Sequence, residues 1–287
     1  MKTNRRLLTP ILLAILSGAA HGQSFTEMNG EWHIPANWST GALPTESTVP
    51  IINNSHTANI TAGNPAALAD ILRVGNQNHA THFGRLSIAG DLDVTRNIQI
   101  ASALNAEGYV THTAGTVTFG SNFQVASIGA GSKAEYTISG GTLSGPAGNI
   151  AVGTQGAGLF HVSGDTATVL ANSMNIGATA TLRFTLGAGG ASPIAINAGV
   201  TIADGATLIV DGAAFTGSLG SISLIQAAGI TGGFGDNVTF ENFGALTPEL
   251  SQVGGSLTVI PEPRVYGLAL CLLAFAGIFL RRLRARA

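Results

Sequence analysis

The sequence predicts an all-β protein whose body is a parallel β-solenoid (β-helix) of about six coils of roughly 25 residues each. Two observations carry this prediction. Short runs of alternating apolar and polar residues recur at a nearly constant spacing and end in glycine, which accounts for 39 of the 287 residues. No run has an apolar stripe at helical spacing long enough to connect two parallel strands, so strand must follow strand directly.

The repeat has two phases. The first series of runs ends at Gly90, Gly115, Gly140 and Gly164, at intervals of 25, 25 and 24 residues, and continues to Gly187 and Gly212. The second series precedes the first and consists of Val74, Ile100, Ile128, Val152 and Ile176. Two series with one period favour coils that stack at about 4.8 Å, with residues of equal phase in ladders. A β-sandwich is the alternative architecture, although its strands would not keep such a period.

The alternation also predicts which side chains face the lumen. Leu86, Tyr136 and Phe160 share a phase, so we expect them to form one buried ladder, and the residues of the second series to form another. Only 6% of the residues are aromatic, so Tyr136 and Phe160 would be among the largest side chains available to fill the core.

Residues 1–22 read as a secretory signal peptide. Lys2, Arg5 and Arg6 precede an apolar run at residues 7–16, and small residues before Gln23 predict cleavage there. The run is about half as long as a membrane-spanning helix requires. We therefore expect export through the Sec translocon.

The remaining body divides into three predicted parts. Residues 23–70 should cap the first coil, 71–245 should form the coils, and 246–260 should form a final strand and linker. The first part contains both tryptophans of the chain, Trp32 and Trp38, in the pattern Gly-Glu-Trp followed by Asn-Trp-Ser-Thr-Gly. This pattern resembles the opening segment of autotransporter-passenger-like repeat proteins, and residues 223–234 and 254–259 resemble their last strands. The resemblance implies a solenoid fold with covered ends.

The chain closes with a Pro-Glu-Pro motif (Pro261, Glu262, Pro263), an uncharged apolar segment at residues 265–280, and an arginine cluster. The cluster consists of Arg281, Arg282, Arg284 and Arg286. As a helix the segment would be roughly 24 Å long, which is short for a membrane, and the arginines should stay cytoplasmic. Two prolines one residue apart keep the motif extended and accessible.

This tail resembles the PEP-CTERM sorting signal. The resemblance implies that a membrane-embedded exosortase recognises Pro261, Glu262 and Pro263, cuts the tail, and passes the protein from the inner membrane to the cell surface or matrix of a Gram-negative-type bacterium. Arg264 departs from the pattern, because the family usually has a small residue there. A permanent single-pass anchor is the alternative.

The lone Cys271 lies in the apolar segment, where it is best explained as a small lipid-facing residue.

The charge distribution argues against a protein that binds nucleic acid. Residues 7–263 contain five basic residues and all 15 acidic ones, which gives this body a formal charge of −10. Nucleic acid is therefore a poor partner, since its binding needs a basic surface. An acidic body suits a soluble surface protein that repels its own copies.

Several polar residues are candidates for a functional site. Asp91 and Asp93 share one side of a strand and could bind a cation, while Asp165 has the phase of Asp91 three coils away. His112 and His161 both lie three residues before a glycine of the first series, which predicts that they share an outward phase, and His79 and His82 form a weak metal-binding pattern. The sequence shows no carboxylates in phase on adjacent coils with a basic partner. It therefore predicts no catalytic, cofactor or metal site, and the polar residues are better explained as solvated edges and turns.

These observations predict a non-enzymatic structural or interaction protein of the cell surface or extracellular matrix, associated with exopolysaccharide. A carbohydrate-binding or adhesive module is the second reading, and it requires a row of exposed aromatic residues on one face, for which Tyr109 and Phe119 are the candidates. A β-helix polysaccharide lyase or hydrolase is the third, and it requires a cluster of carboxylates or arginines on adjacent coils.

Overall fold

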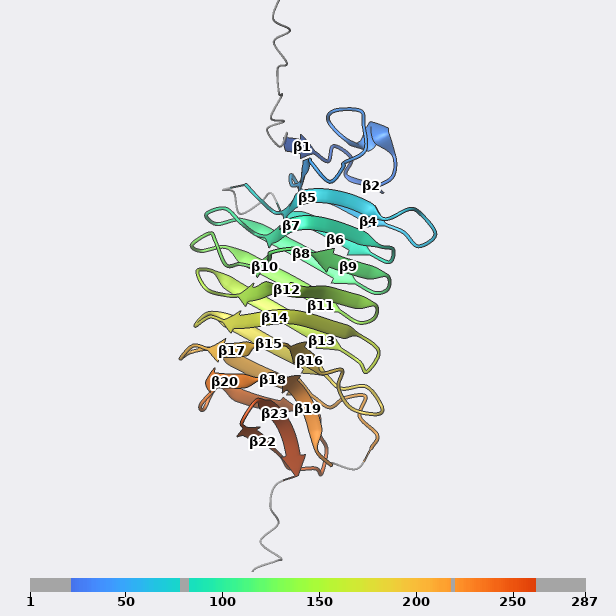
Figure 1. Ribbon diagram of the computed structural model, residues 1–287. Helices are drawn as coiled ribbons and strands as arrows, with labels where there is room; N and C mark the ends of the chain where they lie inside the picture. The colour runs from blue at the N-terminus through green and yellow to red at the C-terminus, as the bar shows by residue number, and fades with distance from the viewer. Residues whose placement is uncertain (1–21, 78–82, 218–219, 262–287) are drawn as a thin grey trace, which may run out of the picture.

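A computed structural model describes residues 22–77, 83–217 and 220–261. Figure 1 shows these residues as a stack of β-coils, with the first strands at one end and β22 and β23 at the other. The predicted signal peptide, the segment 265–280 and the arginine cluster lie outside the described residues. Within the described residues there is no helix long and apolar enough to cross a membrane.

Two large sheets form the stack. The nine-stranded sheet contains, in spatial order, β2 (Asn29–Glu31), β4 (His56–Ile60), β6 (Gly84–Ile88), β8 (Glu107–His112), β11 (Lys133–Ile138), β13 (Ala157–Ser163), β15 (Ala180–Thr185), β18 (Thr207–Asp211) and β21 (Val238–Glu241). A short 3-10 helix, Pro35–Asn37, lies in the loop that follows β2.

The 14-stranded sheet faces it across the lumen. Its strands are β1 (Gly22–Ser24), β3 (Val49–Ile52), β5 (Ala67–Val74), β7 (Leu92–Ile100), β9 (Thr116–Phe119), β10 (Asn122–Val125), β12 (Thr142–Val152), β14 (Thr168–Ile176), β16 (Ile194–Ile196), β17 (Gly199–Ile202), β19 (Ile222–Gln226), β20 (Gly229–Gly232), β22 (Pro248–Val253) and β23 (Ser256–Pro261). The described strand pairs are parallel, apart from the pairs that β23 makes with β19 and β22. The predicted parallel β-solenoid is confirmed.

The stack has about eight turns, not six. The additional turns arise where the sequence shows no clear repeat. Within the segment assigned to the cap, β1 already pairs in parallel with β3, and β2 with β4. The first pairing includes Gly22, one residue before the expected cleavage point. At the other end β21 adds a strand after an unusually long coil, because Leu208 pairs with Val238.

The first predicted ladder is confirmed. Leu86, Val110, Tyr136 and Phe160 pair in register on successive strands, and the ladder continues to Leu182 and Leu208. Tyr136 and Phe160 are fully buried, with ring centroids 5.3 Å apart, and Phe123 packs edge-on against Tyr136 at 4.7 Å. An aromatic stack therefore fills this part of the lumen.

The second ladder differs from its prediction at one rung. Val74, Ile100, Val152 and Ile176 pair as expected, but Val125 occupies the middle position and Ile128 does not. Ile128 lies after the end of β10 and is 38% exposed. The reason is that the residue after the strand end, which has a positive φ here as on the two neighbouring coils, is Ala126 instead of a glycine, so the Ile-Gly pair marks a later position in the turn.

Glycine placement explains why Phe119 is buried instead of exposed. Its ring turns into the bend of the neighbouring coil, where a Cβ on Gly145 would lie 2.2 Å from the Phe119 ring and one on Gly148 would lie 2.6 Å from it. Both positions must therefore lack a side chain. Phe119 is 4% exposed, so the prediction that it stands on an outer face is wrong.

Both ends of the stack are covered. At the first turn Trp38 lies between Phe25 and Trp32, with ring centroids 5.1 and 4.7 Å away. Its Nε1–H donates to the main-chain oxygen of Trp32 at 2.8 Å. At the last turn the antiparallel hairpin of β22 and β23 pairs with β19. The parallel stacking of this sheet therefore ends in an antiparallel hairpin.

Candidate functional site

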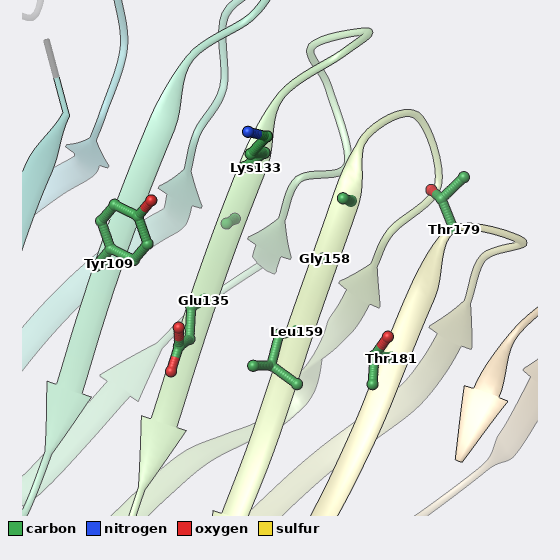
Figure 2. A pocket seen from close by; sticks show the side chains of 9 residues that line it. Tyr109, Lys133, Glu135, Gly158, Leu159, Thr179 and Thr181 are labelled. Atoms are coloured by element: carbon green, nitrogen blue, oxygen red, sulfur yellow. The ribbon is translucent and has the colours of Figure 1, made fainter. Parts of the chain in front are cut away.

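The outer face of the nine-stranded sheet carries a shallow groove. Its floor is a row of outward side chains that pair in register on successive strands: Thr57, Arg85, Tyr109, Glu135, Leu159 and Thr181. We call this row and the hollow above it the Tyr109 groove. It consists of two adjoining hollows of about 390 and 240 Å³, and both are lined by Tyr109 and Glu135. Figure 2 shows the second hollow, with Tyr109, Glu135, Leu159 and Thr181 on neighbouring strands.

Tyr109 is held in place by a polar contact at its hydroxyl. The Tyr109 Oη–H donates to Glu107 Oε2 at 3.0 Å, and Lys133 Nζ lies 3.5 Å from Glu107 Oε1. Partial burial, followed by the hydrogen bond to Glu107, raises the pKa of Tyr109. The hydroxyl therefore stays protonated and remains a donor, while the ring lies along the groove.

A cation and a second ring flank Tyr109. Phe83 meets it edge-on, with ring centroids 6.2 Å apart and planes at 77°. The Arg85 guanidinium carbon lies 4.0 Å from the centre of the Phe83 ring and 5.5 Å from that of Tyr109. Cation–π contacts of this kind hold an arginine without consuming its N–H donors. Among the residues that the structure describes, no carboxylate pairs with Arg85, which leaves these donors for a ligand.

A second polar cluster lies further along the same face. Arg183 Nη2 contacts Asp211 Oδ2 at 2.8 Å and Glu241 Oε2 at 3.0 Å. Asp211 and Glu241 pair in register on β18 and β21. The prediction that no adjacent coils carry carboxylates in phase with a basic partner is therefore wrong. The long coil between β18 and β21 hid the pairing, because a 25-residue period does not place position 241 beside 211.

The electrostatics of this cluster are those of a structural link. Hydrogen bonds from Asn242, the Ala213 amide and Arg183 lower the pKa of Asp211, against the opposing effect of burial. A glycosidase needs one carboxyl whose pKa is raised so that it can act as an acid. Asp211 lacks that shift, and Arg183 forms an ion pair with each of the two carboxylates.

The two histidines do not share a phase. His112 pairs with Ile138 and faces the lumen, whereas His161 pairs with Thr137 and faces outward. The glycine marker misled the sequence reasoning, because in this coil Gly115 lies three residues after the inward position instead of two. His112 is fully buried; its Nδ1 lies 2.8 Å from Tyr136 Oη, and its Nε2 lies 3.2 Å from the Gly115 oxygen. A neutral ring that donates from Nε2 and accepts at Nδ1 satisfies both contacts.

We expect this buried histidine to make the protein sensitive to acid. Burial lowers the pKa of His112 from its usual 6.5, and burial followed by repulsion from Arg183 lowers that of His161. The unfolded chain therefore binds these protons more readily. The free energy of unfolding should be largest above about pH 6.5 and fall as the pH drops below it. Urea denaturation at pH values between about 8 and 5 measures this slope.

A double variant, His112→Leu with Tyr136→Phe, removes the buried pair without leaving either partner unsatisfied. The free energy of unfolding of this variant should depend less steeply on pH over the same range. His161→Gln should remove only the part of the pH dependence that His161 contributes. The acid range below about pH 5 is avoided because Asp70 and Asp211, whose pKa values are lowered, begin to lose their own stabilisation there. An unchanged slope in the double variant would contradict the assignment.

The remaining candidates are accounted for by local structure. Asp91 accepts from the Thr116 amide at 2.8 Å, Asp93 from the Thr118 hydroxyl at 2.6 Å, and Asp165 from the Gly189 amide at 3.3 Å. Each carboxylate therefore ties one coil to the next. No group of metal-binding side chains occurs within the described ranges. His79 and His82 lie outside the described residues.

Of the sorting motif, only Pro261 is described. It is exposed at the end of β23 and lies opposite Pro248 of β22. Glu262, Pro263 and the arginine cluster lie outside the described residues.

Comparisons of the chain with family models, with curated proteins and with solved structures found no match.

Proposed function

We propose that this is an exported, non-enzymatic structural or interaction protein of the cell surface or extracellular matrix, delivered by exosortase-dependent processing. The observation that carries the proposal is the junction at Pro261. A solenoid with covered ends finishes in β23, and the exposed Pro261 at the end of that strand opens the Pro-Glu-Pro motif. A processing enzyme could therefore approach the motif without unfolding the body.

The shape of the body supports a structural role. About eight turns at about 4.8 Å make a stack roughly 40 Å long, stabilised by contacts between neighbouring coils. Side-chain ladders reinforce the outer faces, as where Arg73 donates to Gln99 at 3.0 Å and Gln99 donates to Gln124 at 3.1 Å. Such a stack suits a spacer or scaffold. The Asp211–Glu241 pair is the arrangement that most resembles a hydrolase site, and the ion pairs that Arg183 makes with both carboxylates support a structural role for it.

The processing prediction tests the proposal. Cells that contain the matching exosortase should release a species whose C-terminus lies near residues 261–263. Glu262→Ala should leave the protein in the inner membrane, because the recognition motif is lost while the apolar segment and the arginines remain. Mass spectrometry of surface material and of membranes measures both species.

Glu249→Ala is the matched control. Glu249 is an exposed acid on β22 that pairs with Ile260, the residue before the motif, and its loss should leave processing unchanged. If intact peptides that span residues 264–280 dominate the surface material, the chain has a permanent anchor and the sorting proposal is wrong.

A carbohydrate-binding module remains the second candidate, and the Tyr109 groove is the observation that favours it. The groove offers one partly exposed aromatic side chain, Tyr109, with a cation and a carboxylate beside it, in place of a row of exposed aromatic residues.

A further inference from the structure

We propose that the Tyr109 groove binds a single strand of uncharged polysaccharide that lies across the strands, along the solenoid axis. This inference deepens the proposed matrix role, and it rests on that role only for the source of the polymer. Three properties of the groove point to this ligand: its length, the order of its side chains, and its charge.

The length of the groove fits a chain better than a compact molecule. Its floor spans six successive strands, from Thr57 on β4 to Thr181 on β15. At about 4.8 Å per strand this is roughly 24 Å. Sites for compact small molecules are concave and enclose most of the ligand surface. Here two shallow hollows lie end to end and share Tyr109 and Glu135, so an extended ligand could occupy both.

The order of side chains fits the two kinds of surface on a sugar. A hexose has faces of C–H groups and a rim of hydroxyls. Tyr109 and Leu159 supply apolar contacts on either side of Glu135, about 10 Å apart across two strand intervals. The Glu135 carboxylate can accept hydrogen bonds from hydroxyls, and Arg85, which pairs with no carboxylate among the described residues, can donate to them.

The groove is also organised before a ligand arrives. Glu107 holds the Tyr109 hydroxyl, while Phe83 and Arg85 flank the ring. Side chains held in this way lose little conformational freedom on binding, which favours affinity at a shallow site.

The charge of the groove selects against acidic polymers. Arg85 and Lys133 are balanced by Glu107 and Glu135, so the groove is locally neutral, and it belongs to a body with a formal charge of −10. A polyanion would approach against long-range repulsion and find no net positive charge at the site. An uncharged polysaccharide meets neither obstacle.

Affinity electrophoresis of the full-length protein tests the inference. The protein migrates through native gels that contain one of five uncharged polymers: hydroxyethylcellulose, a soluble β-1,3-glucan, mannan, galactan or dextran. A gel containing polygalacturonate serves as the acidic comparison. We expect at least one uncharged polymer to retard the protein and polygalacturonate not to do so.

Three variants assign the binding to the groove. Tyr109→Ala should weaken the retardation at least about tenfold, as expected for loss of a central aromatic contact, while Tyr109→Phe keeps the ring and should retain most of it. Ile209→Ala is the matched control, because Ile209 is an outward, partly buried residue on β18 beyond the groove. Circular dichroism and denaturation midpoints identify any variant that fails to fold. If Tyr109→Ala is such a variant, Leu159→Ala replaces it, and its retardation should be weaker than that of Tyr109→Phe.

Each adverse result has a defined meaning. The inference is overturned if no uncharged polymer retards the protein, if polygalacturonate alone does so, or if Tyr109→Ala binds as well as the parent. The assay does not depend on processing. A failure of the sorting proposal therefore leaves its outcome intact, and a failure to bind glycans leaves the sorting proposal standing.

Discussion

Replacing Phe160 with alanine is expected to lower the free energy of unfolding by about 3–5 kcal/mol, the usual cost of truncating a large buried aromatic side chain. Phe160 is fully buried and packs at 5.3 Å against Tyr136 and at 6.3 Å against Phe123. These contacts join three strands from three coils. The cavity would lie in the middle of the stack, where the backbones on both sides are fixed by parallel ladders and cannot collapse into it.

Urea or guanidinium denaturation measures this loss, with Leu159→Ala as the control. Leu159 is the preceding residue on β13 and faces outward into the Tyr109 groove. Its truncation should cost less than half as much, because a partly exposed side chain loses less burial. Equal losses for the two variants would show that Phe160 does not face the lumen.

Trp38→Ala is expected to have an effect of similar size, about 3–5 kcal/mol, but at the end of the stack. Trp38 is 2% exposed and fills the space between Phe25 and Trp32. Its loss also leaves the Trp32 main-chain oxygen without the donor that now lies 2.8 Å away. The first turn would then be uncovered, and its strand edge would be open to pairing with other chains.

Amide hydrogen exchange locates this effect. Protection should fall most for the amides of β1 to β4, since in a stack each coil depends mainly on its neighbours. Trp38→Phe should show an intermediate loss, because it keeps a ring but not the N–H donor. Ile34→Ala is the control in the same segment, as Ile34 is 47% exposed and should change stability little. A loss of protection that is uniform along the stack would argue against a local cap.

The sequence was most informative where the coils have nearly equal length. From Gly84 to Val162 the strands of the nine-stranded sheet follow one another at intervals of 24 to 26 residues. Period-2 alternation therefore identified Leu86, Tyr136 and Phe160 as one buried ladder. The tryptophan pair likewise identified the covered end, because large apolar side chains near an open coil have few other places to pack.

The sequence reasoning failed where a coil departs from the period. One residue more or fewer in a turn reverses the face of every later side chain when phase is counted from the turn. This is why His112 was expected outside and lies inside, and why Ile128 was expected in a ladder that Val125 occupies. In the folded chain, backbone hydrogen bonds between strands determine which residues pair and which face each side chain takes. The spacing of glycines only approximates this pairing.

By itself, the sequence determined the fold class and the principal core ladder, since each depends on patterns within a short stretch of chain, while the two targeting segments stay predictions. The tertiary structure alone decided the number of turns, the Arg183 link to Asp211 and Glu241, and the Tyr109 groove. These features join side chains from different coils. The physical reason is that contacts across the stack depend on the length of every intervening turn, so an error of one residue separates groups that the folded chain brings together.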